Sequence, residues 1–182
     1  MNETQLVEEC IKGNEQCRTL LYNQYSKGLY GIALRYTSCQ EDAQDVLQEA
    51  FIRIFNNLKQ YNGTGKLQAW MTRIVINQAL KLYQLNKKAF PVENYEDYQE
   101  KLSDVSITDS DKLSYNVLLD FIRQLPDGYR MVFNLCEIEG YSYEEVSKIL
   151  HCTNATCRSQ LFKAKNVLRK KVVEFTKNES LL

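Results

Sequence analysis

Apolar side chains recur at steps of three and four residues along most of the chain, which is the period of an amphipathic α-helix. No stretch shows a competing β-strand pattern. The pattern predicts helices over residues 6–36 (with a break at Gly13 and Asn14), 41–55, 68–86, 113–125, 128–137 and 143–150, and a last one from about residue 155. The sequence therefore predicts an all-α protein.

The segment from Pro91 to about Lys112 differs from the rest because it has little apolar periodicity and many Asp, Glu, Ser and Thr residues. Such a composition is typical of a flexible linker. We therefore expect two compact helical domains joined by a flexible acidic linker. The expected boundaries are 1–90 for the first domain, 91–112 for the linker, 113–176 for the second domain and 177–182 for a tail.

Two short helices with a tight turn between them are expected in the second domain. Ser142 followed by Glu145 is a capping box, so a helix should begin at Tyr143. After a polar turn, Thr153 or Asn154 can cap the next helix through its side-chain oxygen. This pair predicts a helix-turn-helix, in which the second helix enters the major groove of DNA.

The outward face of that second helix is basic, and no acidic residue occurs on it before Glu174. Basic side chains attract phosphates, Arg158 can pair with a guanine edge, and Phe162 can touch a thymine methyl group. The face contains Arg158, Ser159, Phe162, Lys163, Lys165, Asn166, Arg169 and Lys170. The pattern favours DNA binding over the alternative, an ordinary helical hairpin whose basic face is merely solvated.

The helix expected over residues 68–86 has a second polar stripe beside its apolar face. The stripe contains Trp70, Arg73, Asn77, Lys81, Gln84 and Lys88, and the core face contains Leu67, Met71, Ile74, Val75 and Leu82. Amide and basic side chains in one row suit exposed single-stranded bases and their phosphates. For Trp70 alone, a core anchor is the favoured interpretation. The preceding loop, Asn62–Lys66, lacks the spacing of a nucleotide-binding phosphate loop.

The helix over residues 41–55 combines acidic residues in its first turn with an outward Ile52. Asp45, Gln48 and Glu49 are expected on the same outward face. An exposed isoleucine beside carboxylates suggests a partner surface, although a solvated face also explains the charges.

Charge is segregated along a chain whose formal net charge is zero. No acidic residue lies between Glu49 and Glu93, whereas acidic residues predominate from Pro91 to Asp127 and basic ones after His151. The separate acidic and basic segments indicate the kind of partner that each part of the chain binds, whereas the net charge of zero does not.

Several classes of protein are disfavoured by what the chain lacks. Its N-terminus has no secretory signal and no apolar run approaches a membrane span, so we expect a cytoplasmic protein without membrane insertion. The six cysteines include no CxxC pair and are interpreted mainly as reduced core residues. His151, the single histidine, lies beside Cys152 with Cys157 nearby, a poor set for tetrahedral metal binding. We expect no catalytic residues, no metal and no cofactor.

These motifs, in this order, resemble the extracytoplasmic-function (ECF) sigma factors of bacterial RNA polymerase. The resemblance extends from Leu21 to Lys171. It rests on the stretches Leu21–Tyr25, Ala33–Tyr36, Glu41–Phe51, Ala69–Asn77, Leu125–Pro126, Tyr141–Val146 and Thr156–Leu161. It implies a promoter-directing subunit that binds core RNA polymerase through the clamp and flap, helps to open promoter DNA, and is held by an anti-sigma factor.

The resemblance also implies roles for individual residues. The polymerase clamp would be bound by Asp45, Gln48, Glu49, Phe51 and Ile52. The minus-ten element would be bound by Lys66, Trp70, Arg73, Asn77 and Lys81. The minus-thirty-five element would be bound by Thr156, Arg158, Ser159, Phe162 and Lys163. The acidic linker would lie near the polymerase active site and the RNA exit path.

The turn and the recognition helix depart from the family pattern. His151, Thr153 and Ala155 stand where the family usually has Gly, Pro and Gly, and Gln160 replaces a usual Arg. We expect these departures to affect which promoter sequence is recognised more than whether the protein acts at promoters. Two other functions stay open from the residues alone: a free-standing helix-turn-helix regulator that acts without polymerase, and a helical adaptor without a DNA role.

Overall fold

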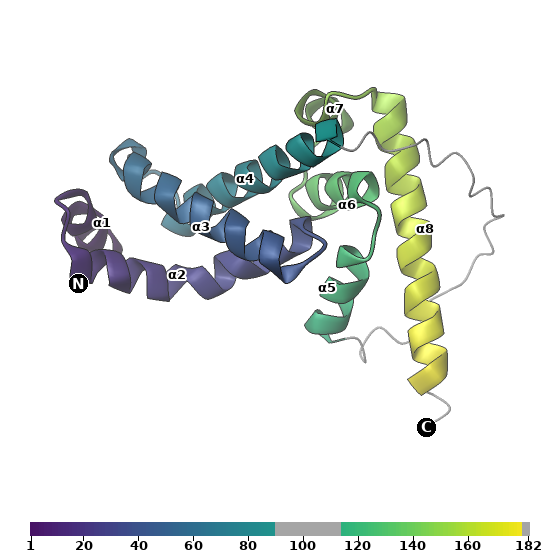
Figure 1. Ribbon diagram of the computed structural model, residues 1–182, viewed down its shortest axis with the longest axis horizontal. Helices are drawn as coiled ribbons and strands as arrows, with labels where there is room; N and C mark the ends of the chain where they lie inside the picture. The colour runs from purple at the N-terminus through teal and green to yellow at the C-terminus, as the bar shows by residue number, and fades with distance from the viewer. Residues whose placement is uncertain (90–113, 180–182) are drawn as a thin grey trace. The chain divides into compact units, whose positions relative to one another are not determined.

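The computed structural model describes residues 1–89 and 114–179, and these two ranges are helical and contain no strand (Figure 1). The α-helices are α1 (Glu3–Ile11), α2 (Glu15–Tyr36), α3 (Gln40–Asn57), α4 (Leu67–Ala89), α5 (Tyr115–Arg123), α6 (Asp127–Phe133), α7 (Tyr143–Leu150) and α8 (Asn154–Glu179). A 3₁₀ turn, η1 (Leu58–Gln60), follows α3, and a π-helical turn, η3 (Asn134–Ile138), follows α6. The all-α prediction is confirmed.

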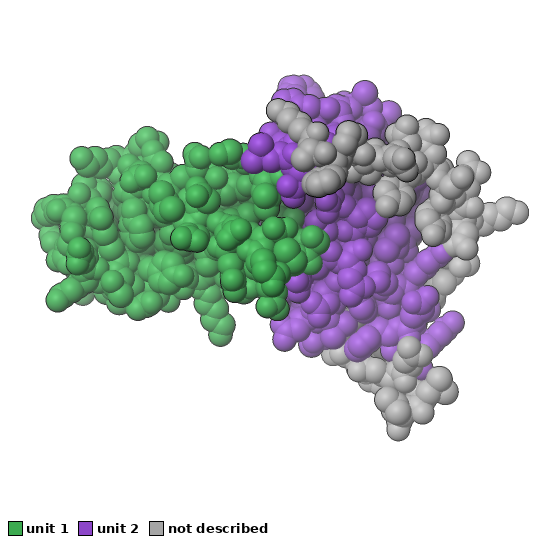
Figure 2. Space-filling model, in the orientation of Figure 1, with its two compact units in different colours: residues 1–83 green, residues 84–182 purple. Residues whose placement is uncertain are grey.

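The chain forms two compact units, Met1–Tyr83 and Gln84–Leu182 (Figure 2). The predicted linker, residues 91–112, lies outside the described residues, as does part of the predicted tail. The domain boundaries proposed from the sequence therefore stay predictions.

The first unit is built on α2 and α3, which pack side by side (Figure 1). Leu21 and Leu29 of α2 and Ile54 of α3 are almost completely buried, because each lies on the apolar stripe of its helix. The buried side of α3 and of the turn that follows it consists of Ala43, Val46, Leu47, Ala50, Ile54 and Leu58. Leu20 of α2 is apolar but 48% exposed.

The break between α1 and α2 falls where the sequence predicts it. Gly13 has a φ of +91°, which is strained for any side-chain-bearing residue. Asn14 then caps α2, because its side-chain oxygen accepts hydrogen bonds from the backbone N–H groups of Gln16 and Cys17.

In the second unit, α8 packs against both α6 and α7. Residues of all three helices close the core: Met131 and Val132 from α6, Val146 from α7, and Cys157 and Leu161 from α8 are buried. The helix expected over residues 128–137 begins at Asp127 and changes to π geometry at Asn134. Together, α6 and η3 extend from Asp127 to Ile138, one residue beyond the predicted range at each end.

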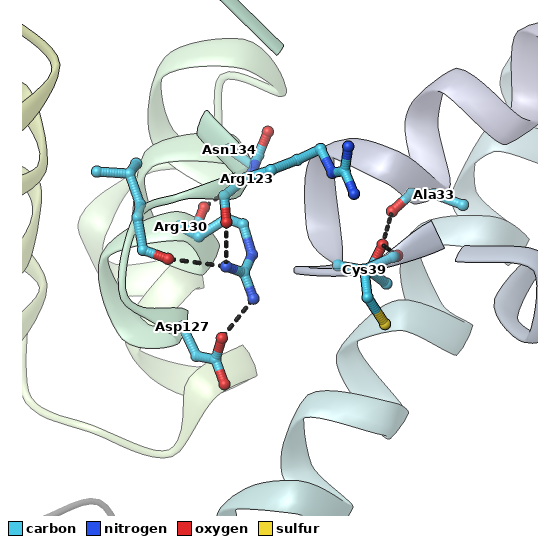
Figure 3. A network of polar contacts seen from close by, with 8 residues as sticks. Ala33, Cys39, Arg123, Asp127, Arg130 and Asn134 are labelled. Carbon is cyan, nitrogen blue, oxygen red and sulfur yellow. Dashed lines mark hydrogen bonds and ion pairs between the residues drawn. The ribbon is translucent and has the colours of Figure 1, made fainter. Parts of the chain in front are cut away.

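A buried arginine holds the turn between α5 and α6 (Figure 3). Arg130 is only 3% exposed, and its Nη1 donates hydrogen bonds to the carbonyl oxygens of Arg123 (3.0 Å) and Leu125 (2.7 Å). Its Nη2 forms an ion pair with Asp127. The guanidinium thus satisfies one carbonyl at the C-terminus of α5 and one in the turn that follows it.

Arg130→Ala should lower the free energy of unfolding of the second unit by about 2–3 kcal/mol, since buried carbonyls lose a charged donor. Hydrogen exchange of the α6 backbone amides, read beside thermal denaturation, measures the loss. Arg169→Ala, at an exposed arginine of α8, is the matched control. If both substitutions lowered the free energy of unfolding equally, the proposed role of Arg130 in the turn would be contradicted.

Candidate nucleic-acid interface

The helix-turn-helix forms as the sequence predicts. The helix α7 spans Tyr143–Leu150, and its capping box is complete: the Glu145 N–H donates to Ser142 Oγ, and the Ser142 N–H donates to the Glu145 carboxylate at 2.8 Å. These hydrogen bonds from Ser142 lower the pKa of Glu145. The Oγ1 of Thr153 then accepts the Thr156 N–H at 3.1 Å, so Thr153 is the cap of α8.

The turn between α7 and α8 depends on one unusual backbone conformation. His151 ends α7 with a φ of 51° and a ψ of 52°, the left-handed region that glycine adopts most easily. In the residues described, it is the one non-glycine residue with a positive φ. This conformation is the physical reason why glycine would be favoured at position 151, where this chain has histidine.

The N-terminal half of α8 presents the predicted DNA-contacting residues. Arg158 and Ser159 are exposed, Thr156 and Lys163 are half-buried, and the Phe162 side chain is 51% exposed although it is apolar. On the opposite side of the helix, Cys157, Leu161 and Ala164 are buried. A polar and aromatic face opposite a buried stripe is the geometry that a recognition helix needs.

Tyr143 of α7 supports Arg158 of α8. The guanidinium carbon of Arg158 lies 5.6 Å from the centre of the Tyr143 ring, a cation–π distance. Such a contact restrains a long side chain without using its hydrogen-bond donors. Sequence reasoning missed Tyr143, because only the packing of α7 on α8 brings the ring beneath the arginine.

Three residues predicted on or near this face have other environments. Lys165 forms an ion pair with Glu137 at 2.8 Å, and Asn166 is half-buried. Gln160 lies over Gly128 of α6, where an added Cβ would come 3.0 Å from the Gln160 Nε2. The basic face is therefore narrower than the sequence pattern suggests. The Gln160 side chain packs against α6 of the same unit.

The first unit has a second polar row along α4. Arg73, Asn77 and Lys81 are exposed and follow one another at four-residue steps, so they lie in one line on the helix surface. The buried face differs in part from the prediction: Ile76, Ala79 and Leu80 are buried, whereas Ile74 and Leu82 are only partly so.

The loop before α4 is held in place by aromatic side chains. Trp70 is half-buried, and its ring lies 5.7 Å from that of Tyr61. The hydroxyl of Tyr61 donates to the carbonyl oxygen of Gly65 at 2.7 Å. Trp70 thus anchors the loop through Tyr61 while part of its ring stays accessible, and Lys66 is exposed at the end of the loop.

The outward face of α3 also forms as predicted. Asp45, Gln48 and Glu49 are exposed, and Ile52 is 48% exposed. Phe51 is buried, with its ring 4.6 Å from that of Tyr22. Tyr22, which is 42% exposed, places an aromatic ring at the surface beside the buried Phe51, which the family resemblance implied in clamp binding. The face therefore combines carboxylates with exposed apolar side chains.

Comparison with known proteins agrees with these two units. The model of the family Sigma-70 region 2 matches residues 21–89, and that of Sigma-70, region 4 matches residues 115–168. The RNA polymerase sigma-H factor of Pseudomonas aeruginosa is 30% identical over 92% of this chain and 92% of its own length. The ECF RNA polymerase sigma-E factor of Haemophilus influenzae is 29% identical over 94% and 96%.

The chain belongs to the ECF sigma factors. It is a transcription initiation factor that binds core RNA polymerase and directs it to promoters. Among solved structures, the chain is similar to the sigma factor RpoE of Bartonella quintana in complex with the anti-sigma factor NepR. That match has a TM-score of 0.49 and 18% identity and covers 85% of this chain and 95% of the other. Within the described ranges, no helix of this ECF sigma factor is long and apolar enough to cross a membrane.

His151→Gly should raise the free energy of unfolding by about 1 kcal/mol, because it removes the cost of the left-handed backbone. Urea denaturation followed by circular dichroism measures the change. His151→Ala keeps a Cβ at the same backbone angles and should give no gain. If the alanine variant were stabilised as much as the glycine variant, backbone strain at His151 would not be the cause of the gain.

Proposed function

We propose that this ECF sigma factor divides promoter recognition between its two units. The exposed row Arg73, Asn77 and Lys81 on α4 binds the unstacked minus-ten strand, together with Lys66 and Trp70. The exposed face of α8 binds the minus-thirty-five duplex through Thr156, Arg158, Ser159, Phe162 and Lys163. The observation that supports this division best is that each unit leaves a row of DNA-compatible side chains exposed opposite its buried stripe.

On α4, the chemistry of the row suits single-stranded DNA. An amide can form paired hydrogen bonds with a base edge, and the flanking Arg73 and Lys81 can neutralise phosphates on either side of Asn77. Trp70 and Tyr61 offer aromatic surface beside the same loop, on which an unstacked base can rest.

On α3, the face of Asp45, Gln48, Glu49 and Ile52 is the proposed contact with the polymerase clamp. Carboxylates around an exposed aliphatic side chain provide a polar rim and an apolar centre, the usual anatomy of a protein interface. Tyr22 extends this apolar centre, and Phe51 supports it from the core.

Several further features belong to the same proposal. The second unit contacts the polymerase flap. An anti-sigma factor holds the protein inactive until a signal releases it. The protein acts in the cytoplasm. The protein has no catalytic step of its own; the polymerase performs the chemistry. A free-standing regulator is disfavoured, because it leaves the outward faces of α3 and α4 without a role.

Run-off transcription from a genomic promoter pool tests the proposal, with purified core polymerase in the presence and absence of this protein. New discrete transcripts that require both components are the expected result, and their start sites define the promoter. Tight duplex binding without initiation or complex formation with core polymerase would support the free-standing regulator instead.

Asp45→Ala should raise the Kd for core polymerase by about tenfold, the cost of removing one charged interface contact. Glu41→Ala, at another exposed carboxylate in the first turn of α3, is the matched control and should leave the Kd unchanged. Surface-immobilised core polymerase provides the measurement. An unchanged affinity of the Asp45 variant would remove that residue from the interface.

Arg158→Ala should weaken binding to the minus-thirty-five duplex by about tenfold, because one contact between a side chain and a base edge contributes about that factor to affinity. Tyr143→Leu should weaken it by about threefold, since the cation–π support of Arg158 is lost, while Tyr143→Phe should retain it. Fluorescence anisotropy with the duplex found by run-off transcription measures all three. Equal behaviour of the Leu and Phe variants would show that the ring has no positioning role.

A further inference from the structure

Two cysteines meet at the turn of the helix-turn-helix. The Sγ atoms of Cys152 and Cys157 lie 3.3 Å apart and share a hydrogen bond. Cys152 is half-buried, whereas Cys157 is completely buried in the first turns of α8. The pair is therefore one thiol that solvent reaches and one that the core shields.

The turn itself brings the sulfur atoms together. The left-handed conformation of His151 reverses the chain, and the Cys152 N–H donates to the Ser147 carbonyl oxygen at 3.0 Å. On the other side, the Cys157 N–H donates to the Thr153 carbonyl oxygen at 3.0 Å. Both cysteines are thus held by backbone hydrogen bonds that belong to the two helix ends.

The Cys157 thiol holds its proton firmly. Burial, and then the hydrogen bond with Cys152, raise the pKa of Cys157 to about 12, so Cys157 keeps its proton at neutral pH. The buried thiol can therefore act as the hydrogen-bond donor in its contact with the Cys152 sulfur. Only the thiolate is a strong nucleophile, which assigns the first reaction to the accessible sulfur.

We propose that Cys152 and Cys157 form a peroxide-sensitive thiol pair that regulates DNA binding. The Cys152 thiolate attacks hydrogen peroxide, which gives the Cys152 sulfenic acid and hydroxide. The Cys157 sulfur then displaces the sulfenic hydroxyl, so that an S–S bond forms, the S–O bond breaks, and the Cys157 proton leaves with that oxygen as water. Peroxide is the oxidant, and a small thiol restores the reduced pair by exchange.

A metal site would be the competing use of thiols at this turn, but the geometry does not favour it. Throughout the described ranges, no three His, Cys, Asp or Glu side chains are grouped so that they could hold a metal ion. Cys136 is half-buried, and burial raises the pKa of its thiol. The pair of Cys152 and Cys157 is the one supported by a direct sulfur contact.

The effect on DNA rests on the proposed function of α8. A disulfide requires the sulfur atoms to approach from 3.3 Å to about 2.0 Å. Cys157 lies between Thr156 and Arg158, so this approach displaces the first turn of α8, its Thr153 cap and the proposed base contacts. Oxidation should therefore weaken binding to duplex DNA.

The chemistry can be tested without DNA. Trypsin cleaves after Lys148 and Arg158, so both thiols fall in the single peptide 149–158, which contains no other cysteine. The full-length protein is reduced, treated with increasing hydrogen peroxide and alkylated. The expected product is a peptide that has lost two hydrogens and takes up no alkylating reagent. A peptide that stays fully alkylated while Cys39, another partly exposed thiol, is oxidised would overturn the proposal.

Variants separate the roles of the two sulfurs. In Cys157→Ala, oxidation should stop at the Cys152 sulfenic acid, which dimedone traps. In Cys152→Ser, the peptide should resist the same peroxide concentration. Cys136→Ser is the matched control and should form the disulfide normally. Disulfide formation that required Cys136 would overturn the assignment of the pair.

DNA binding is then measured on the reduced and oxidised protein with a labelled duplex of random sequence at low salt. Oxidation should weaken binding by about tenfold, the effect of losing a phosphate contact at low salt, and a reducing thiol should reverse it. An unchanged affinity of the disulfide form would overturn the regulatory role. If even the reduced protein fails to bind, the proposed function of α8 is contradicted, whereas the thiol chemistry is judged by the peptide alone.

Discussion

The structure depends on the limited surface that a helix can bury. With 3.6 residues per turn, a helix that packs on one side leaves the opposite stripe in solvent. In α4, burial of Met71 and Val75 leaves Arg73, Asn77 and Lys81 in an exposed row. The surfaces proposed for polymerase and DNA are thus the sides that remain when each core is closed.

Polar interactions in the second unit fix where its helices begin and end. The guanidinium of Arg130 closes the end of α5, the capping box of Ser142 starts α7, and Thr153 starts α8. Each satisfies backbone groups that a helix end leaves unpaired. The direction of α8 within its own unit is then set by its packing against α6 and α7. The proposed thiol pair lies at the same turn, directly before the exposed face that is proposed to bind DNA.

Local rules succeeded where the information was local. The bounds of α7, its capping box and the break at Gly13 were predicted from a few adjacent residues, and the structure confirms them. The same rules were less accurate about which side of a helix is covered. Ile74 and Leu82 were expected on the core face of the helix over residues 68–86 and are only partly buried, whereas Ile76 and Leu80 are buried. Periodicity predicts which side of a helix is apolar, but how far burial extends around the helix depends on the neighbouring helix.

By itself, the sequence determined the all-α fold, the capped helix-turn-helix and the family, because helix period, capping residues and motif order are properties of short stretches. Only the tertiary structure decided that Tyr143 lies beneath Arg158, that Lys165 pairs with Glu137, and that the sulfur atoms of Cys152 and Cys157 touch. These contacts depend on how a turn directs one helix against another, and no spacing of residue types specifies that direction.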